Sequence, residues 1–310
     1  MFKKLLAILL TCLMLIPCGV AMAGEAETLT SGDYKYTLND DGSATITRYT
    51  GKAKALTIPS ELDGHPVTAI GDMAFFYCTS LTSITLLDSI SSIGANPFAY
   101  CKKLTQIIVS PDHPTLATID GVLFEKPTRT LICYPYTFTA ESYAVPQGIQ
   151  AIGNRAFCGC SSLTSIILPD GLTSIGKGAF SSCDSLTSIT LPDTLTSIGE
   201  SAFSRCISLT SITLPDTLTS IGESAFSGCT SLTSITLPDS VTAIGGSAFL
   251  GCLSLTSITL PDTLTSIGDM AFADCPNLTL TVPRDSYALA YAKENGIPYT
   301  YTDSMDWLNG

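Results

Sequence analysis

Apolar positions recur along most of this chain at a constant step of 23 residues. One unit, LTSITLPDTLTSIGESAFSGCTS, runs from Leu209 to Ser231. Neither the 3.6-residue period of a helix nor the 2-residue period of a strand covers all its apolar positions. The Ile212-x-Leu214 step alternates as in a β-strand. Pro215 then turns the chain, because proline restricts φ and lacks a donor. Residues 223–227 are long enough for one helical or 3₁₀ turn. Each unit therefore predicts one strand, one turn and one short helical segment.

The repetition predicts the architecture. A single unit of this length cannot bury its own apolar side chains, so neighbouring units must stack. The recurring positions are the leucines Leu163, Leu186, Leu209, Leu232, Leu255 and Leu278, the cysteines Cys160, Cys183, Cys206, Cys229, Cys252 and Cys275, and the earlier pairs Leu81, Leu104 and Cys78, Cys101. We therefore expect a repeat solenoid, a right-handed leucine-rich repeat coil, with repeats over 56–109 and 146–283.

Both ends of the array have the composition of caps. Residues 24–55 predict an N-terminal β cap, since alternating apolar residues flank an Asp41-Gly42 turn typical of a hairpin. Residues 284–310 predict a C-terminal cap and tail. There Ser286 can N-cap a short helix that ends before Gly296. Such caps cover the apolar end rungs of a solenoid.

Residues 110–145 interrupt the repeat. They contain two strand-like runs on either side of Lys126-Pro127-Thr128, which predict a protruding hairpin insertion and an irregular rung. A departure from a regular array is a candidate for specificity, and an insertion tolerated without function explains it equally well. The candidate specificity residues of this hairpin are Lys126, Arg129, Tyr134 and Tyr136.

The first residues predict export. Lys3 and Lys4 precede an apolar run over 5–16, and Ala21-Met22-Ala23 forms a small-x-small cleavage site. Residues 1–23 are therefore expected to be a signal peptide cleaved after Ala23, which predicts a secreted or bacterial cell-surface protein. A lipoprotein alternative would use Cys18, where a proline stands in place of the small preceding residue.

Charge narrows the range of partners. The net charge is −12 and no cluster of basic residues is visible, which argues against nucleic acid as a partner. No second long apolar segment follows the first, so no membrane span is expected. We expect a protein partner, and the sequence sets neither its identity nor the oligomeric state.

Written out, the unit resembles the BspA-like class of bacterial leucine-rich repeats. The matching positions are Cys183, Leu186, Ile189, Leu191, Pro192, Leu195, Ile198, Gly199, Ala202, Phe203 and Cys206. The chain departs from the pattern at Leu87, at Pro97 and over 110–145. The resemblance implies a secreted or surface protein-protein interaction module, adhesin-like, that binds host or bacterial surface or matrix proteins.

A candidate binding face follows from strand alternation. Side chains on either side of a buried isoleucine point away from the core, which aligns two ladders of hydroxyl groups. The candidate residues are Ser188, Thr190, Ser211, Thr213, Ser234, Thr236, Ser257 and Thr259. An extended protein partner could dock on this face. Alternatively, threonine simply suits strands, and a regular ladder could also order water in the manner of ice-binding proteins.

Other polar columns have simpler explanations. An aspartate follows each turn proline, as at Asp193 and Asp216, but one ladder of carboxylates offers too few ligands for Ca²⁺. We therefore expect no metal and no cofactor. The column cysteines should project in parallel and remain free thiols. The pairing of Cys133 and Cys158 stays open.

The sequence predicts no catalytic residues and no enzyme. His65 and His113 are the only histidines, and both are expected in solvated loops. Repeated Ser and Asp residues do not form the unique set that catalysis needs. Two alternatives to a binding module remain: a structural spacer or coat component without a specific ligand, and a hydrolase, which would need Ser or Cys beside a histidine.

Overall fold

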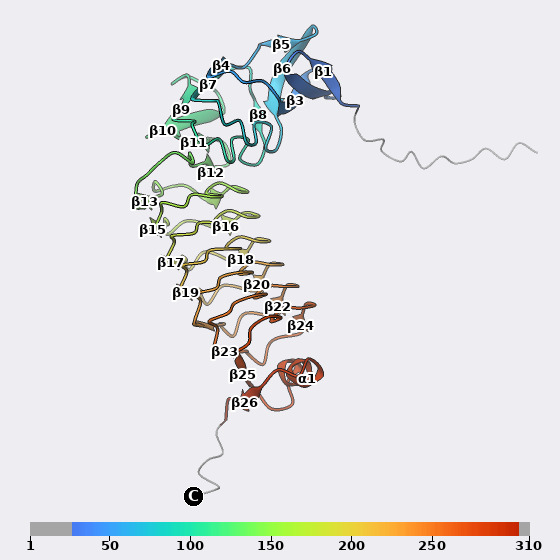
Figure 1. Cartoon of the computed structure of the whole chain (residues 1–310), viewed down its shortest axis with the longest axis vertical. Helices are drawn as coiled ribbons and strands as arrows, with labels where there is room; N and C mark the ends of the chain where they lie inside the picture. Colours follow the sequence, from blue (N-terminus) through green and yellow to red (C-terminus); the bar gives the residue numbers. More distant parts are fainter. Residues whose placement is uncertain (1–26, 304–310) are drawn as a thin grey trace, which may run out of the picture.

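The chain folds into an elongated column of stacked rungs (Figure 1). The computed structural model describes residues 27–303. The predicted signal peptide and residues 304–310 of the predicted tail lie outside this range. The N-terminal sheet lies at one end of the column and the only helix of the described part lies near the other (Figure 1). The predicted leucine-rich repeat solenoid is confirmed.

The N-terminal cap is the expected hairpin, extended into a small sheet. Strands β1 (Leu29–Ser31), β2 (Tyr34–Leu38) and β3 (Ala44–Tyr49) are antiparallel. The β2–β3 turn has Gly42 at φ +80°, a conformation that glycine adopts without strain. Strand β3 then pairs in parallel with β6 (His65–Ile70), which also pairs with β5 (Glu61–Leu62) and β8 (Ser92–Ile93). The cap therefore joins the column by continuous backbone pairing.

Each regular rung contributes two short strands to two sides of the column. The first strands are β4 (Ala55–Thr57), β7 (Ser83–Leu86), β9 (Gln106–Val109), β13 (Ser142–Ala144), β15 (Ser165–Ile167), β17 (Ser188–Thr190), β19 (Ser211–Thr213), β21 (Ser234–Thr236), β23 (Ser257–Thr259) and β25 (Thr279–Val282). The second strands are β6 and β8, whose bounds are given above, β14 (Ala151–Ile152), β16 (Ser174–Ile175), β18 (Ser197–Ile198), β20 (Ser220–Ile221), β22 (Ala243–Ile244) and β24 (Ser266–Ile267). Equivalent residues pair in parallel, for example Ile189 with Ile212.

The core consists of straight columns of identical side chains. Phe157, Phe180, Phe203, Phe226, Phe249 and Phe272 stack with neighbouring ring centroids 5.1–5.5 Å apart. Five of the six rings are fully buried, because the rungs on either side cover both faces of each ring. The stack exists only when neighbouring rungs are in register, so burial couples each rung to the next.

The column cysteines are free thiols that link rungs, as expected. The thiol of Cys206 donates to the Phe180 carbonyl at 3.1 Å, and that of Cys229 donates to the Phe203 carbonyl at 3.1 Å. Burial raises the pKa of Cys229 to about 12, so the group stays protonated at neutral pH. Cys133 and Cys158, left open above, are free as well. The thiols act here as small buried hydrogen-bond donors.

The corner after each second strand requires glycine. A Cβ atom at Gly222 would lie 2.7 Å from the Ile198 carbonyl oxygen and 2.8 Å from the Glu200 nitrogen, which belong to the preceding rung. The expected helical or 3₁₀ turn that follows takes the form of successive hydrogen-bonded turns. Ser224 there has φ +55° and donates its N–H to Gly246 of the next rung at 2.9 Å. The corner thus sets how closely rungs approach.

The interruption is built into the column and does not protrude, so this part of the prediction is wrong. Strands β10 (Leu116–Ile119), β11 (Val122–Glu125) and β12 (Thr130–Cys133) form an antiparallel meander. Strand β12 then pairs in parallel with β14, so the meander begins the nine-stranded sheet of second strands. Leu123 and Leu131 are fully buried. These strands are built into the column because they have apolar side chains on both faces, and a protruding hairpin would leave one apolar face exposed.

The prediction that His113 lies in a solvated loop is also wrong. Its side chain is completely buried. The Nδ1 atom accepts the N–H groups of Thr115 at 3.2 Å and Leu116 at 3.0 Å, so Nε2 carries the proton and donates to the Leu87 carbonyl at 3.0 Å. One imidazole therefore satisfies three backbone groups between a rung and the meander.

Removing this imidazole is expected to destabilise the protein. In the His113→Ala variant two amide donors and one carbonyl lose their partner, which costs about 2 kcal/mol. Urea unfolding followed by circular dichroism measures the change. The His65→Ala variant is the control, since His65 is partly exposed and the hydrogen bond of its ring is with a single backbone group, the Gly42 carbonyl. Equal stability of the two variants would contradict the role assigned to His113.

The C-terminal cap matches the prediction. Helix α1 (Tyr287–Glu294) is N-capped by Ser286, whose side chain accepts the Leu289 N–H at 3.1 Å. Gly296 follows the helix with φ +65°. Strand β26 (Tyr299–Tyr301), which the sequence did not reveal, then pairs with β25. The last rung is thereby covered on one side by a helix and on another by a strand.

Candidate functional site: the hydroxyl face

The eight candidate residues form a continuous surface, here called the hydroxyl face. Ser188, Thr190, Ser211, Thr213, Ser234, Thr236, Ser257 and Thr259 are all exposed, and each pair flanks a buried isoleucine. Ser188 pairs with Ser211, Thr190 with Thr213, Ser234 with Ser257, and Thr236 with Thr259. The predicted ladders are therefore present along the first strands, at the edge of the column labelled β17 to β23 (Figure 1).

These hydroxyl groups differ from those of the neighbouring threonines. Thr187 donates to the Thr164 carbonyl at 3.2 Å, and Thr210 donates to the Thr187 carbonyl at 3.2 Å. Those groups join rung to rung. Within residues 27–303, none of the eight side chains of the hydroxyl face forms a hydrogen bond to protein. Their donors and acceptors are thus available to water or to a partner.

The face has a hollow at its centre. The sheet of first strands is interrupted between β19 and β21, which belong to separate sheets. A hollow of about 340 Å³ lies over this interruption, lined by Ser211, Thr213, Asp216, Ser234, Thr236 and Pro238, among others. Ile212, Leu214 and Ile235 complete its lining, so a partner would meet a recess with both polar and apolar groups there.

An exposed apolar residue stands in line with the threonine ladder. Ile167 is 65% exposed and lies one repeat before Thr190, at the position that threonine occupies in the later rungs. Its strand β15 pairs with β17. Ile167 is not among the residues that the sequence predicts for the binding face. The signal was available, since LTSIILPD differs from LTSITLPD at this one place.

The hairpin residues separate into surface and core. Lys126 and Arg129 are exposed, and the Lys126 ammonium group donates to the His113 carbonyl at 2.6 Å. Tyr136 is partly exposed. Tyr134 is only 2% exposed and stacks on Phe157 with ring centroids 5.1 Å apart. Tyr134 thus begins the phenylalanine column and cannot serve as a contact for a partner.

The ionisable side chains do not gather into one site. In the part of the chain that the structure describes, no three His, Cys, Asp or Glu side chains lie close enough together to hold a metal ion. The hydrogen bonds of both histidine rings, given above, are all with backbone groups. Neither ring therefore has a Ser or Cys side chain as a hydrogen-bond partner.

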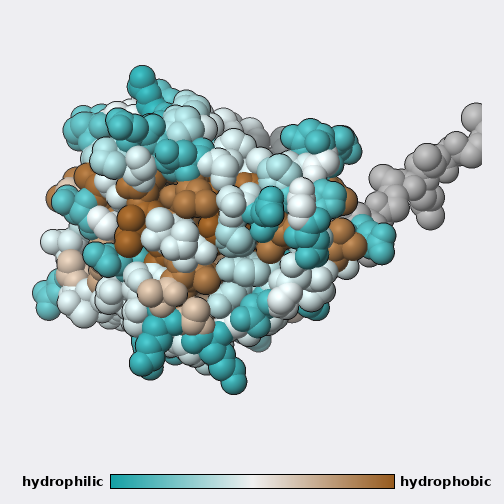
Figure 2. All heavy atoms as spheres, turned by 90° about the horizontal axis from the view of Figure 1, so that it is seen from above, coloured by the Kyte–Doolittle hydropathy of each residue, from teal (hydrophilic) through white to brown (hydrophobic). Residues whose placement is uncertain are grey.

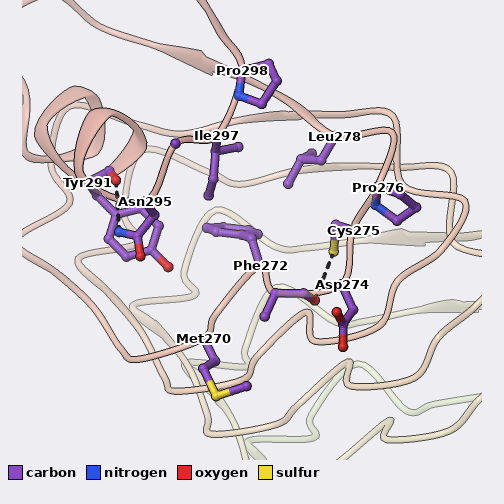
Figure 3. Close-up of a pocket in the computed structure, with 12 residues that line it drawn as sticks. Met270, Phe272, Asp274, Cys275, Pro276, Leu278, Tyr291, Asn295, Ile297 and Pro298 are labelled. Atoms are coloured by element: carbon purple, nitrogen blue, oxygen red, sulfur yellow. Dashed lines mark hydrogen bonds between the residues drawn. The ribbon is translucent and has the colours of Figure 1, made fainter.

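A cavity of about 510 Å³ lies between the last rung and the C-terminal cap. Figure 3 shows Phe272, Leu278 and Ile297 around it, with the Cys275 thiol at one side. The cap replaces a further rung here without filling all of its volume. The cavity thus follows from ending a regular array.

Apolar groups also reach the surface at the N-terminal end. Figure 2, seen from that end, shows apolar residues in a band across the middle with hydrophilic residues on both sides. The exposed large apolar side chains of residues 27–120 are Leu38, Phe76, Tyr77, Ile108 and Ile119. They are candidates for contact in addition to the hydroxyl face.

A solenoid of short parallel strands with leucine, phenylalanine and cysteine columns is a leucine-rich repeat protein. The family model described as BspA type leucine rich repeat region matches in six copies over residues 48–132 and 132–229, more than half of the chain. The chain belongs to this family. The family suggests a protein-interaction or surface module. The comparison with curated proteins found no match.

Solved structures show the same fold. The pneumococcal vaccine antigen PcpA is 18% identical, with a TM-score of 0.62, and the similarity covers 90% of this chain and 99% of that one. A leucine-rich repeat protein from Eubacterium ventriosum is 19% identical, with a TM-score of 0.58, over 81% of this chain and 95% of that one. Among the described residues no helix has the length and apolar character to cross a membrane.

Proposed function

We propose that the protein is a secreted or cell-surface module that binds a host or bacterial surface or matrix protein, in the manner of an adhesin. The contact surface is the hydroxyl face together with Ile167. The observation that carries this proposal is that the eight hydroxyl groups form no hydrogen bonds within the described chain, while their neighbours in each rung do. Membership of a family of surface and interaction modules supports the same function.

The chemistry of the face suits a protein partner. Hydroxyl groups donate and accept, so they can match the N–H and C=O groups of an extended backbone. The central hollow can receive one side chain of the partner. Ile167 adds apolar area, and burying a side chain of this size contributes about 1.5–3 kcal/mol. A polar surface with one apolar anchor is typical of reversible protein interfaces.

The Ile167→Thr variant tests the apolar anchor. It restores the residue found at this position in later rungs, so stability should be unchanged. We expect binding to weaken about tenfold, because the lost apolar burial is worth at least ~1.4 kcal/mol. Biolayer interferometry of the protein without residues 1–23 against laminin, collagen, fibronectin and intact cells measures this effect. Unchanged affinity would remove Ile167 from the interface.

A second variant tests the hydroxyl face itself. Thr213→Lys with Thr236→Lys places two long charged side chains at the hollow and should abolish the same binding. The control is Glu223→Lys, at an exposed position outside the face, which changes the net charge by the same two units. Equal binding of both proteins would contradict the proposal. Self-association with no partner in any assay would favour the structural spacer.

Deletion of 110–145 cannot serve as a test, since these residues supply strands β10 to β12 and part of the core.

A further inference from the structure

A row of aromatic rings lies at the turns that precede the column cysteines, where Tyr77 and Tyr100 come directly before Cys78 and Cys101. The ring of Phe76 is 6.1 Å from that of Tyr77 and 5.6 Å from that of Tyr100, between centroids. Tyr100 and Tyr136 follow at 6.0 Å. Phe76 and Tyr77 are 43% and 57% exposed. Phe76 and Tyr77 lie outside the buried core, so the exposure of these two rings calls for another explanation.

The row ends in a pocket of about 340 Å³. Tyr100 and Tyr136 form its aromatic wall, and Ser182, Asp184 and Arg205 lie on its polar side. Among the described residues neither Asp184 nor Arg205 takes part in an ion pair, and both side chains are exposed. The pocket thus combines ring faces with a carboxylate, a guanidinium group and hydroxyl groups.

The backbone at this pocket is arranged around the rings. Gly159, at φ +77°, precedes a column cysteine, and a Cβ atom there would lie 3.2 Å from both Tyr100 and Tyr136. Equivalent positions in other rungs carry side chains in the same left-handed conformation, with Tyr100 at φ +59° and Arg205 at φ +60°. That conformation costs a non-glycine residue about 1 kcal/mol. Tyrosine and arginine thus occupy positions where glycine would be less strained.

We infer that this pocket binds a saccharide. A pyranose ring presents a face of C–H groups, which packs on tyrosine, and a rim of hydroxyl groups. Asp184 can accept two hydroxyl protons, and Arg205 and Ser182 can donate to oxygen atoms. The volume is at the lower end of the range for small-ligand pockets and suits one or two sugar rings.

Other ligand classes fit less well. Asp184 and the net charge of −12 disfavour a phosphate or another strongly anionic group. Arg205 on the rim and Lys102, whose ammonium group lies 5.7 Å from the Tyr136 ring centroid, disfavour a cation. A purely apolar ligand would leave the charged groups without partners. Only a ligand with both C–H faces and many hydroxyl groups uses every part of the pocket.

The row also sets the direction of a longer ligand. Tyr100 contacts Phe76 and Phe76 contacts Tyr77, so further sugar units would pass over these rings toward the N-terminal cap. Each added ring surface gives additional packing. The affinity for an oligosaccharide should therefore rise with its length.

The test is isothermal titration calorimetry of the protein without residues 1–23. The probes are glucose, galactose, mannose and N-acetylglucosamine, together with the cello-, malto-, manno- and chito-oligosaccharides of two to six units. We expect at least one series to bind, with affinity increasing from the monosaccharide to the tetrasaccharide. Arg205→Ala, Asp184→Asn and Tyr136→Ala should each weaken that binding at least tenfold.

Two controls separate this site from the hydroxyl face and from unfolding. Asp170→Asn changes an exposed carboxylate outside the pocket and should leave saccharide binding unchanged. Thr213→Lys with Thr236→Lys should also leave it unchanged. Thermal unfolding must show that Arg205→Ala and Asp184→Asn, both at exposed positions, keep the stability of the parent.

Absence of binding in all series, or binding insensitive to all three pocket variants, would overturn the inference. Loss of protein-partner binding in the pocket variants, with no saccharide bound, would do so as well.

Discussion

Replacing Phe203 with alanine is expected to lower the free energy of unfolding by about 3–5 kcal/mol. The ring is fully buried and lies between Phe180 at 5.2 Å and Phe226 at 5.5 Å, with interplanar angles of 8° and 4°. Its removal leaves a cavity and exposes a face of each neighbouring ring to it. The parallel strands on both sides hold the rungs apart, so the column cannot collapse to fill the space.

Chemical denaturation followed by far-ultraviolet circular dichroism measures this effect. Ile207→Ala is the matched control, since Ile207 belongs to the same rung and is 44% exposed. Its effect should stay within about 0.5 kcal/mol. If Phe203→Ala were as stable as the control, the phenylalanine stack would not be part of the core.

The second large effect is expected at a corner glycine. The methyl group in Gly222→Ala would meet three backbone atoms at 2.7–2.8 Å, and backbone cannot move aside as a flexible side chain can. Two rungs must then separate locally, which costs about 3 kcal/mol. The midpoint of thermal unfolding should fall by about 6–12 °C. Differential scanning fluorimetry detects such a change directly.

Gly171→Ala provides the matched control for this variant. A Cβ atom at Gly171 has no neighbour within 4 Å, and its φ is not in the left-handed region. The midpoint of this variant should stay close to that of the parent. A similar fall in both variants would mean that the loss of stability at Gly222 does not come from the short distance between rungs.

The regular part of this fold follows directly from the sequence. A constant step of 23 residues places Phe203 beside Phe226 and Cys206 beside Cys229, whatever the details of the turn. The C-terminal helix was equally accessible, because Ser286 and Gly296 mark its ends through local hydrogen bonding and φ. The 23-residue period was sufficient to predict the side-chain columns, and the capping residues were sufficient to predict the helix.

The structure of the irregular part, residues 110–145, could not be predicted in this way. Residues 110–145 have no period, so the sequence did not reveal that β12 continues the sheet or that Tyr134 begins the phenylalanine column. The burial of His113 was missed because its three backbone partners have no sequence signature. Thr115 and Leu116 lie in the same turn, and Leu87 lies one rung earlier. Long-range contacts determine such burial.

The candidate sites also differ in whether the repeat reveals them. Periodicity located the hydroxyl face, since Ser211 and Thr213 repeat with the strands. The pairing of Tyr100 with Tyr136 is different, because the two residues are not related by the repeat and meet only through the meander between them. Similarly, Ile167 is informative only as an exception to the threonine column.

A crystal structure tests the central claim most directly, namely that consecutive rungs bury one another's apolar side chains in straight columns. The account predicts that the Cβ atoms of Cys183, Cys206, Cys229 and Cys252 form a row with a spacing of about 4.8 Å, the distance between paired strands. It also predicts that the hydroxyl groups of Ser211 and Thr213 face solvent. Equivalent cysteines that do not share one axis, or hydroxyl groups turned into the core, would contradict it.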